Sequence, residues 1–201
     1  MSAVDRRKQI LRAAARSFAL FGYKATTMDQ VAKIANVGKG TIYTFFSNKE
    51  DLFDEILYKV ILEMKMLAES RIDRNSTFFE NLFSVLDALL EFRDEHELFI
   101  KLSQEVRDVG TLKAKEGLAT LERVILDYLE REIAMALERK EICSCDPQVA
   151  AFVMFKLYIA LASDFKYVRE PLSQVEIHHY IRMFLADGLA NPNARPVNIP
   201  N

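Results

Sequence analysis

The absence of proline from the first 146 residues constrains the fold of this chain more than any other feature. All five prolines lie from Pro147 onward, so no proline before that point removes a backbone donor or breaks a helix. No stretch alternates apolar and polar residues between turn dipeptides, as a half-buried strand would. The 201 residues are enough for a sizeable core. We therefore predict an all-α fold.

Two short helices joined by a tight turn are predicted between Thr27 and Glu50. Thr27 and Gln30 have the spacing of a capping box, which starts the first helix. Gly38 can adopt a positive φ and ends this helix. The second helix follows over residues 39–46, and its apolar residues share one face. They are Ile42, Phe45 and Phe46.

The other side of the second helix suits a DNA major groove, which admits one helix and presents donors and acceptors to short side chains. Gly40 and Thr44 point most directly away from the apolar side, and a glycine there allows the backbone a close approach. Lys39 can donate to a guanine, and the methyl groups of Thr41 and Thr44 can contact thymine. We expect Lys39, Thr41 and Thr44 to read bases.

Three further residues are expected to hold DNA phosphates. Thr27 precedes the helix that crosses the DNA backbone in a helix-turn-helix, Tyr43 points sideways, and Lys49 follows the next turn. The alternative is an ordinary helical hairpin inside a core. Such a hairpin would not leave lysine, glycine, threonine and tyrosine together on one exposed face.

Charge is distributed unevenly along the chain. Residues 1–49 carry nine basic and two acidic residues, and the remainder carries 18 basic and 27 acidic residues. The formal net charge of −2 therefore conceals a basic head of +7 and an acidic remainder of −9. This division fits a phosphate-binding module joined to a part that does not touch DNA.

These residues belong to a longer pattern that begins at Phe18 and ends at Leu52. It reads F-x-x-x-G-Y-x-x-T-T-M-x-x-V-A-x-x-A-N-V-G-K-G-T-I-Y-x-F-F-x-N-K-E-D-L. On this pattern, residues 10–57 resemble the DNA-binding domain of the tetracycline-repressor (TetR) family of bacterial regulators. The resemblance implies an N-terminal three-helix helix-turn-helix domain and a C-terminal helical domain that binds an effector and dimerises.

We expect three regions: a helix-turn-helix DNA-binding domain over residues 1–47, a helical ligand-binding and dimerisation domain over residues 48–190, and a flexible tail over residues 191–201. Capping boxes are expected at Ser47 with Glu50, Thr77 with Glu80, and Ser173 with Glu176, and an Asp146-Pro147 start is also expected. The expected helices cover residues 5–21, 48–70, 78–93, 97–109, 111–140, 148–167 and 175–189. The helix over 48–70 either carries a signal between the domains or is a structural spacer.

The middle helices are rich in phenylalanine, leucine and methionine, with isolated polar groups. An apolar cavity with a few polar anchors is the usual small-molecule site, and the resemblance implies an effector site here whose occupation releases DNA. We expect an apolar effector, such as a fatty-acyl derivative, because no cluster of like charge is available to hold a highly charged one. The expected ligand-binding residues are Phe83, Phe99, Leu102, Ser103, Val106, Arg107, Tyr128, Phe152 and Lys156. The alternative is a filled core whose polar groups lie at the surface or pair with one another.

The last two helices are expected to form a homodimer interface, as the resemblance implies. The helix over residues 148–167 is apolar nearly all round, so it must be covered on every side. Its apolar run is short and contains Lys156, so we expect no membrane span. A twofold dimer predicts a palindromic double-stranded DNA operator.

The sequence contains no recognisable catalytic motif: no phosphate loop, dinucleotide fingerprint, nucleophile elbow or paired-carboxylate motif. Cys143 and Cys145 form a lone C-x-C, which is a weak metal signal without a second cysteine pair. We therefore expect no cofactor, no metal and no enzymatic activity. Because the start of the chain lacks the apolar core of a signal peptide, we expect a cytoplasmic location.

Together these features predict a ligand-responsive, homodimeric transcriptional repressor. The alternative is an all-α small-molecule enzyme or a protein-binding adaptor with an incidental helical head.

Overall fold

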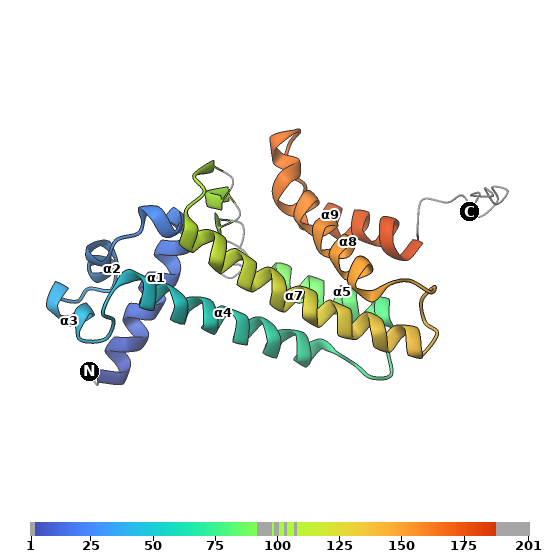
Figure 1. The fold of residues 1–201 in the computed structure, drawn as a ribbon, viewed down its shortest axis with the longest axis horizontal. Helices are drawn as coiled ribbons and strands as arrows, with labels where there is room; N and C mark the ends of the chain where they lie inside the picture. The colour runs from blue at the N-terminus through green and yellow to red at the C-terminus, as the bar shows by residue number, and fades with distance from the viewer. Residues whose placement is uncertain (1–2, 92–97, 99–100, 103, 107, 188–201) are drawn as a thin grey trace. The chain divides into compact units, whose positions relative to one another are not determined.

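The computed structural model describes residues 3–91, 98, 101–102, 104–106 and 108–187, and within these residues every regular element is a helix (Figure 1). The all-α prediction is confirmed. The chain divides into two compact units, Met1–Ala151 and Phe152–Asn201. The predicted boundary at residue 47 lies inside the first unit and stays a prediction.

The head consists of α1 (Ala3–Ala25), α2 (Met28–Ile34) and α3 (Lys39–Tyr43). Thr27 caps α2 as predicted, because its side chain accepts a hydrogen bond from the Gln30 N–H at 3.2 Å. Gly22 interrupts α1 with φ 80° and ψ 176°, a backbone conformation that glycine tolerates. α3 ends earlier than expected, because the Thr44 N–H donates to the carbonyl of Thr41, three residues back, at 3.2 Å.

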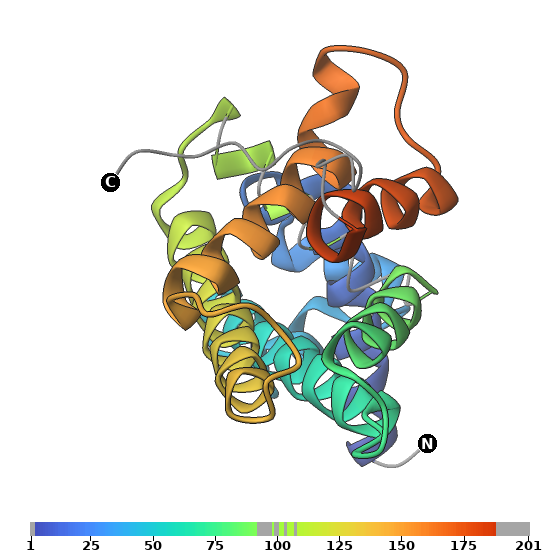
Figure 2. The same cartoon turned by 90° about the vertical axis from the view of Figure 1, so that its right-hand side faces the viewer.

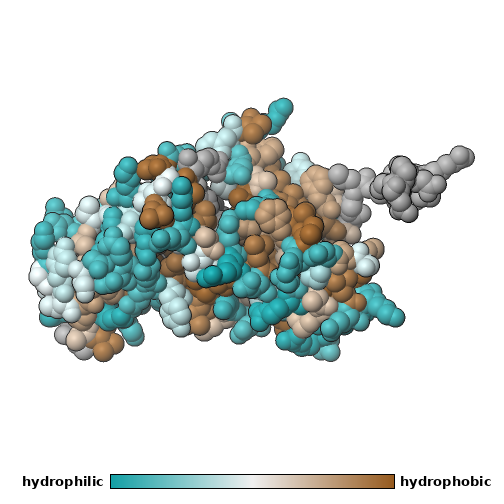
Figure 3. Space-filling model, viewed as in Figure 1, coloured by the Kyte–Doolittle hydropathy of each residue, from teal (hydrophilic) through white to brown (hydrophobic). Residues whose placement is uncertain are grey.

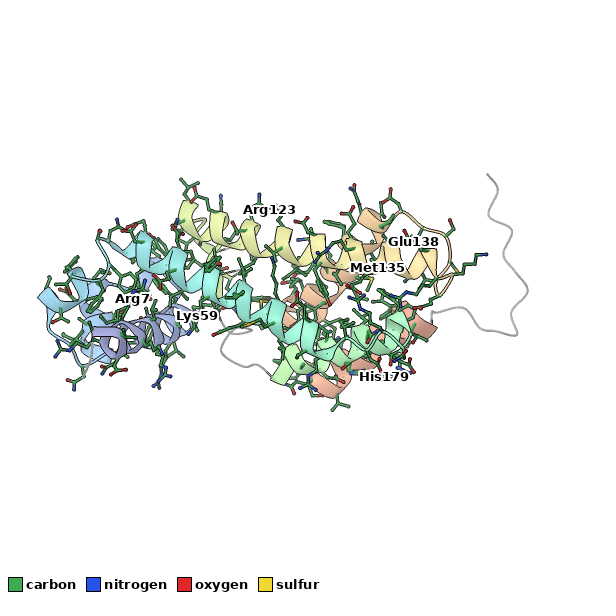
Figure 4. All side chains as sticks on the ribbon, turned by 90° about the horizontal axis from the view of Figure 1, so that it is seen from below. Arg7, Lys59, Arg123, Met135, Glu138 and His179 are labelled. Atoms are coloured by element: carbon green, nitrogen blue, oxygen red, sulfur yellow. The ribbon has the colours of Figure 1, made fainter. Side chains whose placement is uncertain are left out.

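An aromatic cluster forms the core of the head and joins it to α4 (Lys49–Arg71). Phe53 of α4 meets Phe18 edge-on at 5.1 Å and Tyr23 at 4.9 Å between ring centroids, and none of its surface is exposed. Burial of such rings is the main favourable contribution to packing here. Arg7 of α1, labelled in Figure 4, pairs with Glu55 of α4, and its guanidinium lies over the ring of Phe46.

The capping box predicted at the start of α4 is wrong by one residue. Asn48, not Ser47, is the N-cap, and its side chain accepts from the Asp51 N–H at 2.7 Å. The reason is that Glu50 is engaged elsewhere, as the acceptor of the Tyr23 hydroxyl. A local pattern therefore gave the helix but not its cap.

After the head in the chain, α5 (Phe78–Glu91) and α7 (Leu112–Glu138) both pack on α4 (Figure 2). The Thr77 and Glu80 capping box is confirmed. Gly117 of α7 lies so close to α4 that a Cβ there would meet Phe53 Cε1 at 2.9 Å. The helix predicted over residues 97–109 lies partly outside the described residues; those described from Lys101 to Asp108 are helical.

The second unit continues α8 (Pro147–Ile159) into a π-helical turn, Ala160–Asp164, and a 3₁₀ turn, Phe165–Tyr167. α9 (Gln174–Ile181) likewise runs into a π-helical turn, Arg182–Asp187. The predicted caps are confirmed, since Asp146 accepts from the N–H groups of the first turn of α8 and Ser173 forms a capping box with Glu176.

Hydrophobic residues gather over the α8 and α9 region in Figure 3. By length and composition alone, the helical stretch Pro147–Tyr167, which contains an 18-residue window with a mean hydropathy of 1.4, could cross a membrane, but the core helix of a soluble protein passes the same test. Val149, Phe152 and Val153 are each at least half exposed in the single chain. An apolar helix of this kind needs a further surface to cover it.

Candidate nucleic-acid interface

The outer face of α3 is the strongest candidate site. Ile42 is fully buried and anchors the helix in the head. Lys39, Gly40, Tyr43 and Thr44 are exposed, and Thr41 is half-buried. The structure therefore brings these predicted DNA-binding residues together on one short helix with its apolar side turned inward. Thr27, also exposed, begins the neighbouring α2.

Gly40 has no packing role inside the protein. Apart from the adjoining residues and the backbone of the helix itself, no atom of the described residues lies within 4 Å of the position that a Cβ at residue 40 would take. Gly40 also does not adopt a positive φ, so the backbone does not require a glycine there. Space above Gly40 is left for a partner that approaches the helix backbone closely, as a base pair in the major groove would.

Lys39 is held by a neighbour on the same surface. Its Nζ lies 2.8 Å from Asp29 Oδ2, and both side chains are more than half exposed. The hydrogen bond and the charge of Asp29 raise the pKa of Lys39 above its usual value. The ammonium is therefore charged at neutral pH, and the Asp29 contact uses one of its three N–H donors.

Lys49 also has a partner within the protein. Its Nζ donates to the Tyr23 carbonyl oxygen at 3.0 Å and lies 4.2 Å from the centre of the Tyr23 ring. Burial is the largest cause that raises the Tyr23 pKa, followed by its hydrogen bond to Glu50. Lys49 therefore has a structural role at this turn beside its predicted phosphate contact.

Sequence reasoning missed the polar contacts that hold the turn between α1 and α2. The fully buried Ser17 and Thr26 hydroxyls lie 3.1 Å apart, and Thr26 also donates to the Gly22 carbonyl at 2.8 Å. Glu105, from far along the chain, accepts from the Lys24 N–H at 3.0 Å. Of these residues, only Thr26 could have been noticed in the sequence, because it belongs to the Thr-Thr pair of the motif. No residue near Glu105 in the sequence indicates that Lys24 is its partner.

Of the nine predicted effector residues, six lie among the described residues. In the first unit, Phe83 and Leu102 are buried and Val106 is half-buried. Tyr128 is half-buried, and its buried hydroxyl has no hydrogen-bond partner among the described residues. In the second unit, Phe152 is half exposed, and Lys156 Nζ lies 5.6 Å from its ring centre. Phe99, Ser103 and Arg107 lie outside the described residues.

Within the described part of the chain, no group of three or more histidine, cysteine or acidic residues is arranged to hold a metal ion. Cys143 and Cys145 are exposed free thiols in the connection before α8. The head points instead to nucleic-acid binding, because residues 1–49 are basic overall and α3 exposes its polar face.

Comparison with known proteins identifies the family. Residues 10–56 match the description "Bacterial regulatory proteins, tetR family". The chain is 48% identical over 187 residues to YhgD, an uncharacterized HTH-type transcriptional regulator of Bacillus subtilis (strain 168), covering 93% of this chain and 98% of that protein. The chain belongs to the TetR family. It is therefore a transcriptional regulator with a helix-turn-helix DNA-binding head.

Two further proteins are similar to this chain, one in part of its sequence and the other in its fold. The fatty acid metabolism regulator protein of Bacillus subtilis (strain 168) is 27% identical over 135 residues, covering 67% of this chain and 69% of that protein. The structure of the fatty acid degradation regulator FadR from Bacillus halodurans superposes with a TM-score of 0.69 at 19% identity, covering 89% of this chain and 95% of that one. At that identity the superposition shows a common fold only.

Proposed function

We propose that this TetR-family protein is a cytoplasmic, homodimeric repressor that binds a palindromic DNA operator and releases it when a lipophilic small molecule binds. The proposal rests on the two faces of α3. Ile42, on the inner face, is fully buried, while Lys39, Gly40 and Thr44 are exposed. A helix with one buried apolar face and one exposed polar face can enter a major groove without disturbing the core of the head.

In this proposal Lys39, Thr41 and Thr44 read bases, and Gly40 allows the helix to approach them. Thr27, Tyr43 and Lys49 contact phosphates. The Thr44 hydroxyl donates to the Thr41 carbonyl at 2.7 Å, so it is available to DNA as an acceptor while its methyl group can contact thymine. Because Lys49 already contacts the Tyr23 carbonyl and ring, it either gives up these contacts when it binds a phosphate or keeps them and donates a further N–H to the phosphate.

The dimer is proposed to form through α8 and α9 with the turns that follow them. Support comes from the exposed apolar side chains Val149, Phe152 and Val153 on α8 and Phe184 beyond α9. A second copy would cover these surfaces in an isologous interface. Twofold symmetry of the protein then accounts for a palindromic operator, because each head reads one half-site.

The effector is proposed to be largely apolar, such as a fatty-acyl derivative. The proposed walls come from the nine predicted effector residues, which include five apolar side chains and two separate cations, Arg107 and Lys156. The relative named as a fatty acid metabolism regulator is consistent with an acyl ligand. Burying about ten methylenes can contribute up to about 8 kcal/mol before binding entropy is subtracted, enough to bias a two-state equilibrium of the heads.

Selection from a pool of randomised DNA duplexes tests the DNA-binding proposal. The unmodified protein should enrich a palindrome, and gel mobility shift should confirm preference for that sequence over a scrambled duplex of equal length and composition. Equal retention of the two duplexes would contradict a sequence-specific repressor.

A further inference from the structure

Glu105 connects the segment before α7 to the kink at Gly22 near the end of α1, where residues 22–24 form a turn that leads toward α2. Its Oε1 accepts a hydrogen bond from the Lys24 backbone N–H at 3.0 Å. Its Oε2 occupies the space that a Cβ on Gly22 would need. The residue is only 7% exposed. A buried carboxylate with a backbone partner 81 positions earlier holds two distant parts of the chain at a fixed separation.

The main chain at Glu105 is itself fixed. Its carbonyl oxygen accepts from the N–H groups of Val109 at 2.9 Å and Gly110 at 3.0 Å. Gly110 has a φ of +71°, which closes the helical segment. The carboxylate is therefore presented from an ordered helix end that leads directly into α7.

The turn that Glu105 contacts leads into the DNA-binding helices. Lys24 lies three residues before Thr27, the N-cap of α2. On its other side, α4 holds the same turn through Lys49 on the Tyr23 carbonyl and Glu50 on the Tyr23 hydroxyl. Glu105 thus adds a contact from the predicted effector domain to a turn otherwise held by the head and the start of α4.

We propose that Glu105 is a positioning residue for DNA binding, which orders the turn over residues 22–24 and so orients α2 and α3. This inference rests on the proposed function. Without the contact, the turn samples more conformations, and DNA binding must order it.

Three variants separate the effect of side-chain length at Glu105 from the effect of its charge. Glu105→Asp keeps the charge but shortens the side chain by one methylene, so the hydrogen bond to Lys24 is lost. Glu105→Gln keeps the reach and an acceptor oxygen but removes the charge. Asp108→Asn removes the same charge from an exposed position on the same segment and serves as the control. Loss of a negative charge alone should strengthen DNA binding slightly.

Operator affinity and hydrogen exchange at the Lys24 amide are measured for each full-length variant, well below its unfolding temperature. Glu105→Asp should speed exchange at Lys24 and weaken operator binding about tenfold, equivalent to about 1.4 kcal/mol. Glu105→Gln should retain most of the affinity and protection, and Asp108→Asn should bind at least as well as the unmodified protein.

Unchanged exchange and affinity in Glu105→Asp would overturn the inference. So would a Glu105→Gln variant weaker than Glu105→Asp, because charge rather than the hydrogen bond would then be responsible. If the unmodified protein preferred no duplex, the repressor proposal would fail, and Lys24 exchange in Glu105→Asp would still decide whether Glu105 orders the turn.

Discussion

Asp29 of α2 and Lys39 of α3 form an ion pair, 2.8 Å between Oδ2 and Nζ, on the surface that we propose faces DNA. Pairs this exposed contribute little to stability, because water and salt screen them. Their consequence here is for recognition: the side chain proposed to donate to a guanine is held by an acid from the preceding helix.

Lys39→Ala should relax the preference at one base pair of each half-site by about tenfold to a hundredfold, because a good base contact discriminates to that degree. The measurement is operator affinity against a set of single-base variants. Uniform weakening across all of them would show that Lys39 binds phosphate instead.

Asp29→Asn should tighten binding to all duplexes, since it leaves Lys39 at most a weaker, uncharged hydrogen-bond partner and removes a negative charge near the phosphates. Affinity against salt concentration is the appropriate measurement. Asp51→Asn, which removes a charge from the first turn of α4 without touching Lys39, is the matched control. If both variants gain equally, release of Lys39 makes no contribution.

Gly40→Ala should change stability and DNA affinity in opposite directions. The added Cβ enters open space, and alanine favours a helix over glycine by up to about 1 kcal/mol, so urea unfolding should show equal or greater stability. The same methyl group would separate α3 from the bases and weaken operator binding. A variant with undiminished affinity would rule out close approach at this residue.

Lys49→Ala tests two roles at once. Loss of its contacts with Tyr23 should destabilise the head, by about 1 kcal/mol for a hydrogen bond and stacked cation of this kind. Loss of a phosphate contact should also reduce the slope of log affinity against log salt by about 0.9. A lower unfolding temperature with an unchanged salt slope would leave Lys49 with the structural role alone.

Structural features that depend on residues within one helical turn could be predicted from the sequence. Contacts between residues far apart in the sequence could not. Thr27, Asp146 and Ser173 cap helices as predicted, because each cap and its acceptor or donor lie within one turn. Ser47 does not, because Tyr23 of α1 donates a hydrogen bond to Glu50. Glu105 and Lys24 are 81 positions apart, and no periodicity connects them.

The same distinction applies to the candidate site. The exposed face of α3 follows from helical periodicity around Ile42, so its residues could be named in advance. The pairing of Lys39 with Asp29 depends on the angle between α2 and α3, which the turn over residues 35–38 determines. The π-helical turn after Ile159 also has no signature in the apolar pattern, since that run is apolar on every side.

Ile159→Asp or Phe184→Asp should convert the proposed dimer to monomers and abolish tight operator binding, because a charge in an apolar interface is strongly unfavourable. Sedimentation at micromolar concentration measures the change. The unmodified protein should sediment as a dimer and should not bind to neutral lipid vesicles. Vesicle binding would instead assign the apolar stretch Pro147–Tyr167 to a membrane.

Tyr128 offers the sharpest test of the effector proposal. Its buried hydroxyl has no partner among the residues that the structure describes, which is unfavourable by about 1–3 kcal/mol. Burial raises the Tyr128 pKa to about 12, so the phenol stays a neutral donor at physiological pH. We expect it to donate to the carbonyl or carboxylate of an acyl ligand.

Calorimetry and DNA release should therefore be measured with fatty acids of increasing chain length, for the unmodified protein and for Tyr128→Phe. Affinity should rise with each methylene, by up to about 0.8 kcal/mol where the methylene is fully buried. Tyr128→Phe should keep this dependence on length, lose about tenfold in affinity at every length, and leave the apo protein equally or more stable, since no unsatisfied hydroxyl remains. Affinity that does not grow with chain length, together with DNA release by a polar metabolite, would refute the lipophilic effector and leave the repressor proposal intact.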